Sequence, residues 1–133
     1  MEEYVLDSYA LLAYFNSEPS GSAVLKLFEA ARDQTANLYL SQINLGEIFY
    51  IVLRQRGIEK AQDTLKALHD LPIISCEASE ARILAAAELK AQYPISYADA
   101  FAVALAQELG ASLVSGDPEF KALEPGLLMI WIK

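Results

Sequence analysis

The sequence has few of the residues that most often carry nucleophilic or zinc chemistry. It contains one cysteine, Cys76, and one histidine, His69. The lone cysteine cannot form an internal disulfide, and a Ser-His-Asp or Cys-His device needs a histidine held against its nucleophile. His69 lies in the helix-end string at residues 67–70, which is typical of a surface or C-cap position. Together, Cys76 and His69 are too few ligands for a zinc site.

Other absences narrow the class of protein. No apolar run approaches the roughly 20 residues that cross a bilayer. The N-terminus lacks the positive region and the long apolar stretch of a secretory signal. We therefore expect a cytoplasmic protein without a membrane segment. The sequence also lacks a Gly-x-x-x-x-Gly-Lys loop and a Gly-x-Gly-x-x-Gly fingerprint, so nucleotide binding by those two routes is unsupported.

Basic residues are scarce relative to acidic ones. The chain has 10 Lys and Arg against 18 Asp and Glu, which gives a net charge of -8. Broad electrostatic binding to nucleic acid depends on many cations that neutralise phosphates, so this charge argues against it. A phosphate-bearing substrate approached through metal ions stays open, because bound metals reverse the local sign of the field.

The pattern of apolar residues predicts an α/β fold. A chain of 133 residues, 54% of them hydrophobic, is long enough for one well-buried core, and we expect a single domain over residues 1–133. Short apolar runs predict strands at residues 3–6, 37–40, 72–75, 112–115 and 128–132. Helical patterns lie at 8–15, 21–32, 42–56, 58–69, 79–92 and 97–109, with Gly57 and Gly110 as stop signals. This alternation indicates a parallel five-stranded sheet with helices on both faces.

Four acidic residues lie in apolar segments, where carboxylates are uncommon. Two of them follow predicted strands, one heads the helix at 97–109, and one is interior to the helix at 42–56; these are Asp7, Asp117, Asp99 and Glu47. A carboxylate removed from water is costly unless something compensates it. Too few basic residues lie nearby in the sequence to pair with all four. A hard divalent cation, magnesium or manganese, would serve them together and is the first hypothesis.

Three of these acids also have a structural explanation as helix caps. Asp7 could cap the helix that begins at Ser8, and Asp117 followed by Pro118 is a good N-cap with proline at the first helical position. Residues 96–99, Ser-Tyr-Ala-Asp, fit a capping box. The sequence leaves both roles open for each of the three.

Glu47 lies inside its helix and has no such capping role unless the helix begins late, at Asn44. Its structural alternative is a buried ion pair with Arg54 or Arg56. The same two arginines, aided by Lys60, are candidates for holding a substrate. Their ordinary alternative is to compensate the dipole at the end of the helix.

Four short motifs, in order, resemble the signatures of a known family. They are Val5-Leu6-Asp7-Ser8, Asn44-Leu45-Gly46-Glu47, the run at 96–106 that begins Ser-Tyr-Ala-Asp, and the run at 113–120, Leu-Val-Ser-Gly-Asp-Pro-Glu-Phe. Spanning nearly the whole chain, they are similar to PIN-domain ribonucleases. The small single-domain form is similar to VapC-type toxins of toxin-antitoxin pairs.

The resemblance implies a PIN-like nuclease domain with an acidic pocket for one or two magnesium or manganese ions. By motif, the carboxylate set is Asp7, Glu47, Asp99 and Asp117, and the supporting hydroxyls are Ser8 and Ser115. Many relatives have threonine where this chain has Ser115, which keeps the hydroxyl. Glu119 is a further acid near the site, to which the sequence assigns no role.

The resemblance also implies partners and a reaction. We expect a metal-dependent endoribonuclease that hydrolyses RNA phosphodiester bonds as a toxin, with a cognate antitoxin protein and a homodimeric state. Apolar and aromatic residues at 9–15 and 49–53 offer a surface for either protein partner, unless they form ordinary core. Two alternatives remain: an RNA or DNA processing nuclease without a toxin role, and a non-catalytic interaction module.

Overall fold

Five short strands form one fully parallel sheet in the computed structural model, which describes residues 1–133. The strands are β1 (Glu2–Leu6), β2 (Ala36–Ser41), β3 (Ile74–Cys76), β4 (Ser112–Ser115) and β5 (Met129–Trp131). Their order across the sheet is β3-β2-β1-β4-β5, and every pairing is parallel. The chain turns from one half of the sheet to the other between β1 and β4, which places a ligand crevice at the carboxyl ends of these two strands.

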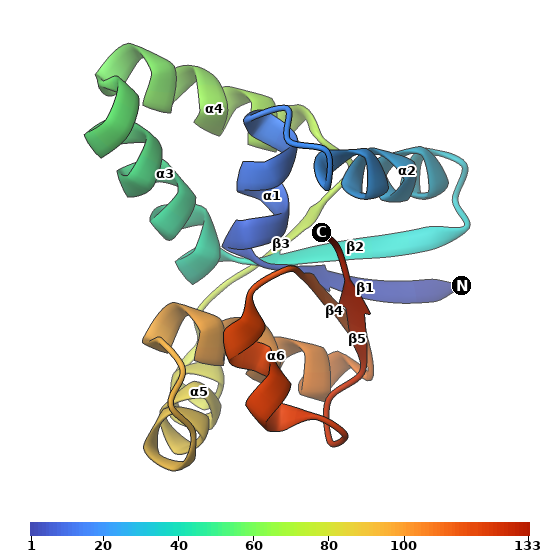
Figure 1. Ribbon diagram of the computed structural model, residues 1–133, viewed down its shortest axis with the longest axis vertical. Helices are drawn as coiled ribbons and strands as arrows, with labels where there is room; N and C mark the ends of the chain where they lie inside the picture. Colours follow the sequence, from blue (N-terminus) through green and yellow to red (C-terminus); the bar gives the residue numbers. More distant parts are fainter.

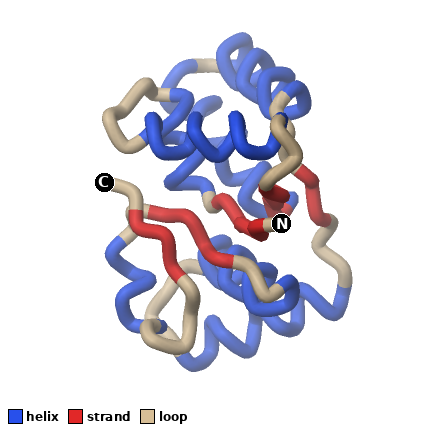
Figure 2. The backbone as a smooth tube through the Cα atoms, turned by 90° about the vertical axis from the view of Figure 1, so that its right-hand side faces the viewer, coloured by secondary structure: helices blue, strands red, loops and turns tan.

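Helices cover both faces of this sheet (Figures 1 and 2). On one face lie α1 (Ser8–Phe15), α2 (Gly21–Arg32), α3 (Gln42–Arg56) and α4 (Ile58–Asp70), and on the other lie α5 (Glu80–Gln92) and α6 (Tyr97–Leu109). A 3-10 helix, η1 (Pro118–Leu123), follows β4. The predicted α/β fold is therefore confirmed. None of the helices has the length and apolarity needed to span a membrane.

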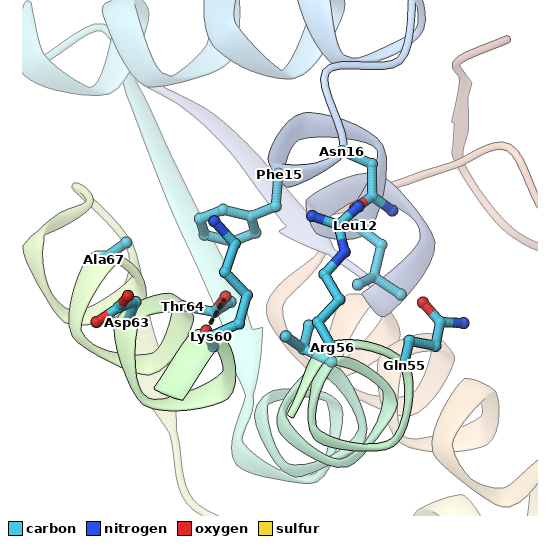
Figure 3. A pocket seen from close by; sticks show the side chains of 10 residues that line it. Leu12, Phe15, Asn16, Gln55, Arg56, Lys60, Asp63, Thr64 and Ala67 are labelled. Carbon is cyan, nitrogen blue, oxygen red and sulfur yellow. Dashed lines mark hydrogen bonds between the residues drawn. The ribbon is translucent and has the colours of Figure 1, made fainter. Parts of the chain in front are cut away.

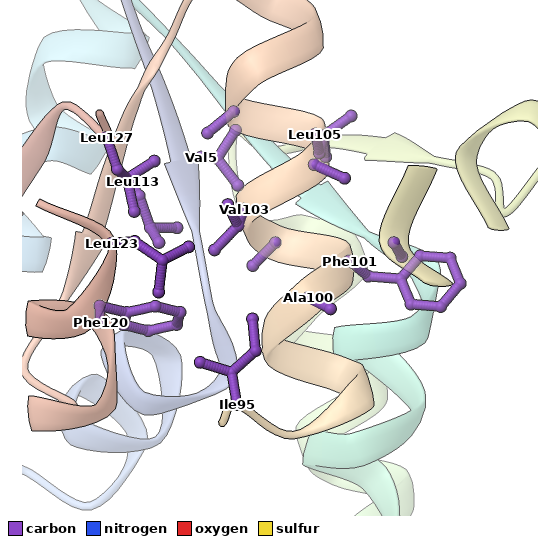
Figure 4. Close-up of a cluster of buried hydrophobic side chains, with 14 of the residues drawn as sticks. Val5, Ile95, Ala100, Phe101, Val103, Leu105, Leu113, Phe120, Leu123 and Leu127 are labelled. Atoms are coloured by element: carbon purple, nitrogen blue, oxygen red, sulfur yellow. The ribbon is translucent and has the colours of Figure 1, made fainter. Parts of the chain in front are cut away.

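Alternating side chains of the central strands divide the core between the two faces. In β1, Leu6 packs with the residues of α1 to α4, whereas Val5 packs with those of α5 and α6. In β4, Val114 and Leu113 divide in the same way. Helix α6 is buried on nearly every side and is rich in alanine, so it fits between the sheet and α5, as Figure 4 shows.

Capping residues set the helix boundaries. Ser41, Ser79 and Ser96 each accept a hydrogen bond from a backbone N–H in the first turn of α3, α5 and α6. Gly57 and Gly110, both with positive φ, follow the ends of α3 and α6. The predicted bounds of α1, α2, α3 and α6 are confirmed, α4 extends one residue further, and α5 begins one residue later because Ser79 is its cap.

The largest difference between the predicted and observed elements is at β3. The sequence predicts a strand at 72–75, but the strand begins at Ile74 and ends at Cys76. Pro72 has no N–H to donate to the sheet, and the Ile73 amide donates instead to the Leu71 carbonyl in a local turn. The strand therefore begins only after this turn.

Candidate active site

Acidic side chains from four separate segments meet at the carboxyl edge of the sheet. Asp7 directly follows β1, Asp117 comes shortly after β4, Asp99 lies in the first turn of α6, and Glu47 projects from α3. Three of them line a pocket of about 450 Å³, whose lining residues are Ser8, Tyr9, Leu12, Glu47, Ile51, Ser96, Asp99, Asp117 and Glu119. Asp7 is not among these lining residues. The structure brings Asp99 and Asp117 together with Glu119, and Glu47 lines the same pocket. Asp7 lies close enough for the charges of Asp117 and Glu47 to raise its pKa. That the four predicted acids share a metal ion stays a prediction.

Asp7 serves as a helix cap and also belongs to this acidic cluster. Its carboxylate accepts a hydrogen bond of 2.9 Å from the Ala10 amide at the start of α1. The residue is only 1% exposed. Burial raises the pKa of Asp7 to about 7, and the charges of Asp117 and Glu47 add to this rise, while hydrogen bonds from Ser115 and Ala10 oppose it. The cap therefore does not compensate the carboxylate fully.

Asp99 shows the same combination of a capped helix start and an uncompensated side chain. The Ser96 hydroxyl accepts a 3.1 Å hydrogen bond from the Asp99 amide, as the predicted cap requires. The residue is 8% exposed. Burial raises the pKa of Asp99 to about 8, helped by the contact with Glu119 and by the charges of Asp117 and Asp7, whereas Ser96 lowers it. At neutral pH this carboxyl group requires a proton or a cation.

Asp117 and Glu119 complete a compact group of carboxylates with Asp99. The Asp117 carboxylate caps η1 by accepting a 3.0 Å hydrogen bond from the Glu119 amide. One oxygen from each of Asp99, Asp117 and Glu119 lies within 4.8 Å of the other two. The sequence left Glu119 without a role, although its place two residues after Asp117 in the same capping turn was the available signal.

Glu47 is half-buried on α3 and lines the pocket. The structure contains no ion pair between Glu47 and an arginine, so that alternative is wrong. The Arg54 guanidinium lies over the Tyr50 ring, 5.4 Å from its centroid, and Arg56 donates a 3.2 Å hydrogen bond to Asn16. Neither arginine lines the acidic pocket.

The two predicted supporting serines are buried beside the acids. The Ser115 hydroxyl accepts a 3.0 Å hydrogen bond from the Asp117 amide and also bonds the Asp7 carboxylate. The Ser8 hydroxyl donates to the backbone carbonyl of Asn44 at 3.3 Å. Ser115 therefore ties together the acids that follow β1 and β4.

Asn44 is a further site residue, to which the sequence analysis gave no role. It is fully buried, and its amide nitrogen donates to the Ser8 hydroxyl and to the Ala98 carbonyl, each at 3.3 Å. Its amide oxygen has no partner within the protein. Asn44 thus joins α3 to the starts of α1 and α6, through the chain neighbours of Asp7 and Asp99. A polar residue one turn before Glu47 on an apolar helix face was the signal for it.

Comparison with known proteins identifies the family of this chain. The sequence matches the family model for the PIN domain over residues 4–124. The chain belongs to the PIN domain family. No curated protein sequence is significantly similar to it.

Solved structures share the PIN fold along nearly their whole length. VapBC2 from Rickettsia felis, bound to a DNA fragment from its promoter, has a TM-score of 0.77 at 21% identity, with 98% of this chain and 99% of that chain covered. Mycobacterium tuberculosis VapC20, described as a Sarcin-Ricin loop cleaving toxin, has a TM-score of 0.72 at 16% identity, with 91% and 95% covered. DNA-bound VapBC from Salmonella typhimurium has a TM-score of 0.74 at 15% identity, with 98% of each chain covered. At these identities the likeness concerns the fold.

The donor set of this PIN domain fits a hard divalent cation. Carboxylate oxygens of Asp99, Asp117 and Glu119 lie close enough to share one ion, and oxygen ligands of this kind select magnesium or manganese. No Lys, Arg or His lines the pocket to neutralise them. Burial is the main cause of the raised pKa values of Asp7 and Asp99, and the charges of neighbouring carboxylates add to it.

A second hollow of the PIN domain lies between α1 and the α3–α4 pair, as Figure 3 shows. It measures about 230 Å³, and its apolar wall includes Leu12, Phe15 and Val52. Arg56 and Lys60 lie beside this wall. Leu12 lines both hollows, so the groove adjoins the acidic pocket.

Proposed function

We propose that this PIN-domain protein is a magnesium- or manganese-dependent endoribonuclease and the toxin of a toxin-antitoxin pair. One observation carries the proposal: carboxylates from three distant segments, those of Glu47, of Asp99 and of the turn that holds Asp117 and Glu119, line a single pocket that no basic side chain enters. Membership of the PIN domain family supports a hydrolytic nuclease. The likeness to VapC toxins supports the toxin role.

Each site residue has a distinct part in this reaction. Asp99, Asp117 and Glu119 would hold the cation. Asp7, whose pKa is raised in part by the charge of Asp117, is a further carboxylate near them. A bound divalent cation supplies Lewis-acid polarisation of water and of the phosphodiester. Glu47, which lines the same pocket, accepts a proton from the attacking water in this proposal.

The supporting residues keep these carboxylates in position. Ser115 bonds the Asp7 carboxylate and the Asp117 amide, and Asn44 fixes Ser8 and the backbone of Ala98. Such outer hydrogen bonds orient metal ligands. The chain has no histidine in the pocket, so carboxylates alone handle protons there.

The groove beside the pocket supports a protein partner. Apolar Leu12, Phe15 and Val52 lie next to the cations of Arg56 and Lys60, and this combination suits an amphipathic, acidic segment of an antitoxin. Because Leu12 also lines the acidic pocket, a segment seated here would reach the active site. The predicted homodimer is checked by the mass of the purified protein in solution.

Replacement of one metal-binding acid tests the nuclease directly. Purified Asp99→Asn and Asp7→Asn variants should keep the fold and lose at least about 100-fold in magnesium-dependent RNA cleavage, since even the outer partners of metal ligands matter by 10- to 100-fold. The matched control is Glu88→Gln, an exposed acid on α5 that lies outside the pocket. Undiminished cleavage by the Asp99→Asn variant, with contaminating nucleases excluded, would defeat the proposal.

The toxin role has its own test. Induction of the wild-type chain should arrest growth, and co-expression of the small protein encoded directly upstream should relieve the arrest. A processing nuclease would cleave RNA in a metal titration but would not arrest growth. A non-catalytic module would show neither effect.

A further inference from the structure

The acidic pocket offers no basic side chain with which to hold a polyanion. Four of its nine lining residues are Glu47, Asp99, Asp117 and Glu119, and none is Lys, Arg or His. A bound cation can hold one phosphate group, but the neighbouring nucleotides need contacts of another kind. Aromatic side chains that stack on the bases can bind these nucleotides without relying on charge.

Tyr9 is the one aromatic residue among the lining residues of this pocket. It lies in the first turn of α1, two residues after Asp7, and is 40% exposed. The turn after β4 supports one side of its ring: a Cβ atom at Gly116 would lie 2.7 Å from the Tyr9 Cζ atom and closer still to Cε1. Because only glycine leaves this space, the ring packs directly on the backbone that leads into Asp117.

This placement gives the ring a fixed position and an open surface beside the acids. On the basis of the proposed function, we propose that Tyr9 is a base-stacking residue, whose ring holds an unpaired base of the nucleotide next to the cleaved phosphate. A base can stack on a side chain only when it has left its duplex. The substrate is therefore single-stranded or looped at the cleavage site.

Three substitutions separate stacking from simple packing. Tyr9→Phe keeps the ring, Tyr9→Leu keeps an apolar side chain over Gly116, and Tyr9→Ala removes both. In cleavage of a short single-stranded RNA with magnesium, the Phe variant should keep the wild-type KM. The Leu and Ala variants should raise KM by about 5- to 100-fold, with a smaller change in kcat, since stacking on one base is worth this much in binding.

The matched control is Tyr97→Ala. Tyr97 is 45% exposed in the first turn of α6, but its ring packs against Phe101, with the centroids 5.1 Å apart, and it does not line the pocket. This variant should keep the wild-type KM. Melting temperatures of all the variants show that each one is folded under the assay conditions.

An abasic scan of the same RNA locates the stacked base. Removal of one particular base should raise the wild-type KM by the same factor as Tyr9→Leu, and should add nothing further in that variant. A Leu variant with the wild-type KM, or additive effects of the two changes, overturns the role of Tyr9. Wild-type cleavage by Asp99→Asn would instead overturn the ribonuclease proposal itself, so the two failures are distinguishable.

Discussion

The two ends of α6 hold acidic residues in opposite circumstances. In the first turn, Asp99 lies among other carboxylates, and its pKa is raised to about 8, chiefly by burial. In the last turn, Glu108 accepts two hydrogen bonds of 3.0 Å from the guanidinium of Arg82 on α5, which lowers its pKa. This Arg82–Glu108 contact is the only salt bridge of the protein.

The helix dipole alone would produce the reverse pattern. It favours a negative charge in the first turn of a helix and disfavours one in the last turn, by about 0.3–1 kcal/mol. Asp99 and Glu108 are shifted against that preference, so their immediate neighbours outweigh the dipole. An acid that has an arginine partner joins two helices, whereas an acid without one needs a cation from outside the chain.

The largest expected effect is on the pH dependence of stability, through Asp99 at the unpaired end of α6 and through Asp7 near it. In the folded protein the pKa values of Asp7 and Asp99 are about 7 and about 8, above the ordinary value of about 4. The folded state therefore retains protons that the unfolded chain releases. Without metal, the free energy of unfolding should be highest near pH 4 and should fall as the pH rises to 8, by about 4 kcal/mol for Asp7 alone.

Chemical denaturation across this pH range, with chelator present, measures the effect. Asp7→Asn should flatten the profile, because an amide does not titrate. Millimolar magnesium or manganese at pH 8 should raise the melting temperature, since the ion binds the folded state. A metal-free protein that is equally stable at pH 5 and pH 8 would contradict the unpaired state of these acids, as would identical melting with and without magnesium.

The hydrogen bonds of Asn44 should have the next largest effect. Asn44 holds the unpaired end of α6 through the Ala98 carbonyl, as Arg82 holds the paired end through Glu108. Asn44→Ala leaves the buried Ser8 hydroxyl and the partly buried Ala98 carbonyl without their donor and should lower the free energy of unfolding by about 1–3 kcal/mol. Gln62→Ala, at an exposed position on α4, should change it by less than about 0.5 kcal/mol. Equal stability of the Asn44→Ala variant and the wild type in urea would exclude this bracing role.

The sequence predicts the role of a residue well when its neighbours in the chain form a recognisable pattern. Serine caps and glycine stops set the bounds of the helices, and an acid after an apolar strand marks Asp7 and Asp117. Asn44 has a weaker signal, a polar residue on an apolar helix face, and nothing local indicates its partners Ser8 and Ala98, which are 36 and 54 residues away. The order of the strands is equally absent from the local pattern, since it depends on which edges meet after the crossovers form.

Glu119 shows a different limit. A polar residue in an exposed turn after Pro118 fits ordinary surface chemistry, and only the closure of α6 against this turn brings its carboxylate to Asp99. An acid in an apolar segment therefore identifies Asp7 and Asp99 from the sequence. Glu119, an exposed acid that completes the same group, has no comparable pattern around it.

The paired end of α6 should give the smallest effect. Arg82 and Glu108 are 26 residues apart in the chain, and both side chains are partly exposed, at 26% and 45%. Exposed pairs of this kind contribute about 0.2–1 kcal/mol and are weakened by salt. Glu108→Gln should lower the free energy of unfolding by this amount at neutral pH and leave RNA cleavage unchanged.

The contribution of Glu108 to the free energy of unfolding should also change with pH in the opposite direction to that of Asp99. Because the folded-state pKa of Glu108 is lowered, its contribution is present above the ordinary glutamate pKa of about 4.3 and is lost as the pH falls through the lower folded value. Glu108→Gln should therefore reduce stability at pH 7 and have no effect in strong acid, whereas Asp99→Asn should increase the stability of the metal-free protein at pH 8 and above. If Glu108→Gln stabilised the protein at pH 7, the contact with Arg82 would not stabilise Glu108, and the contrast with Asp99 would be lost.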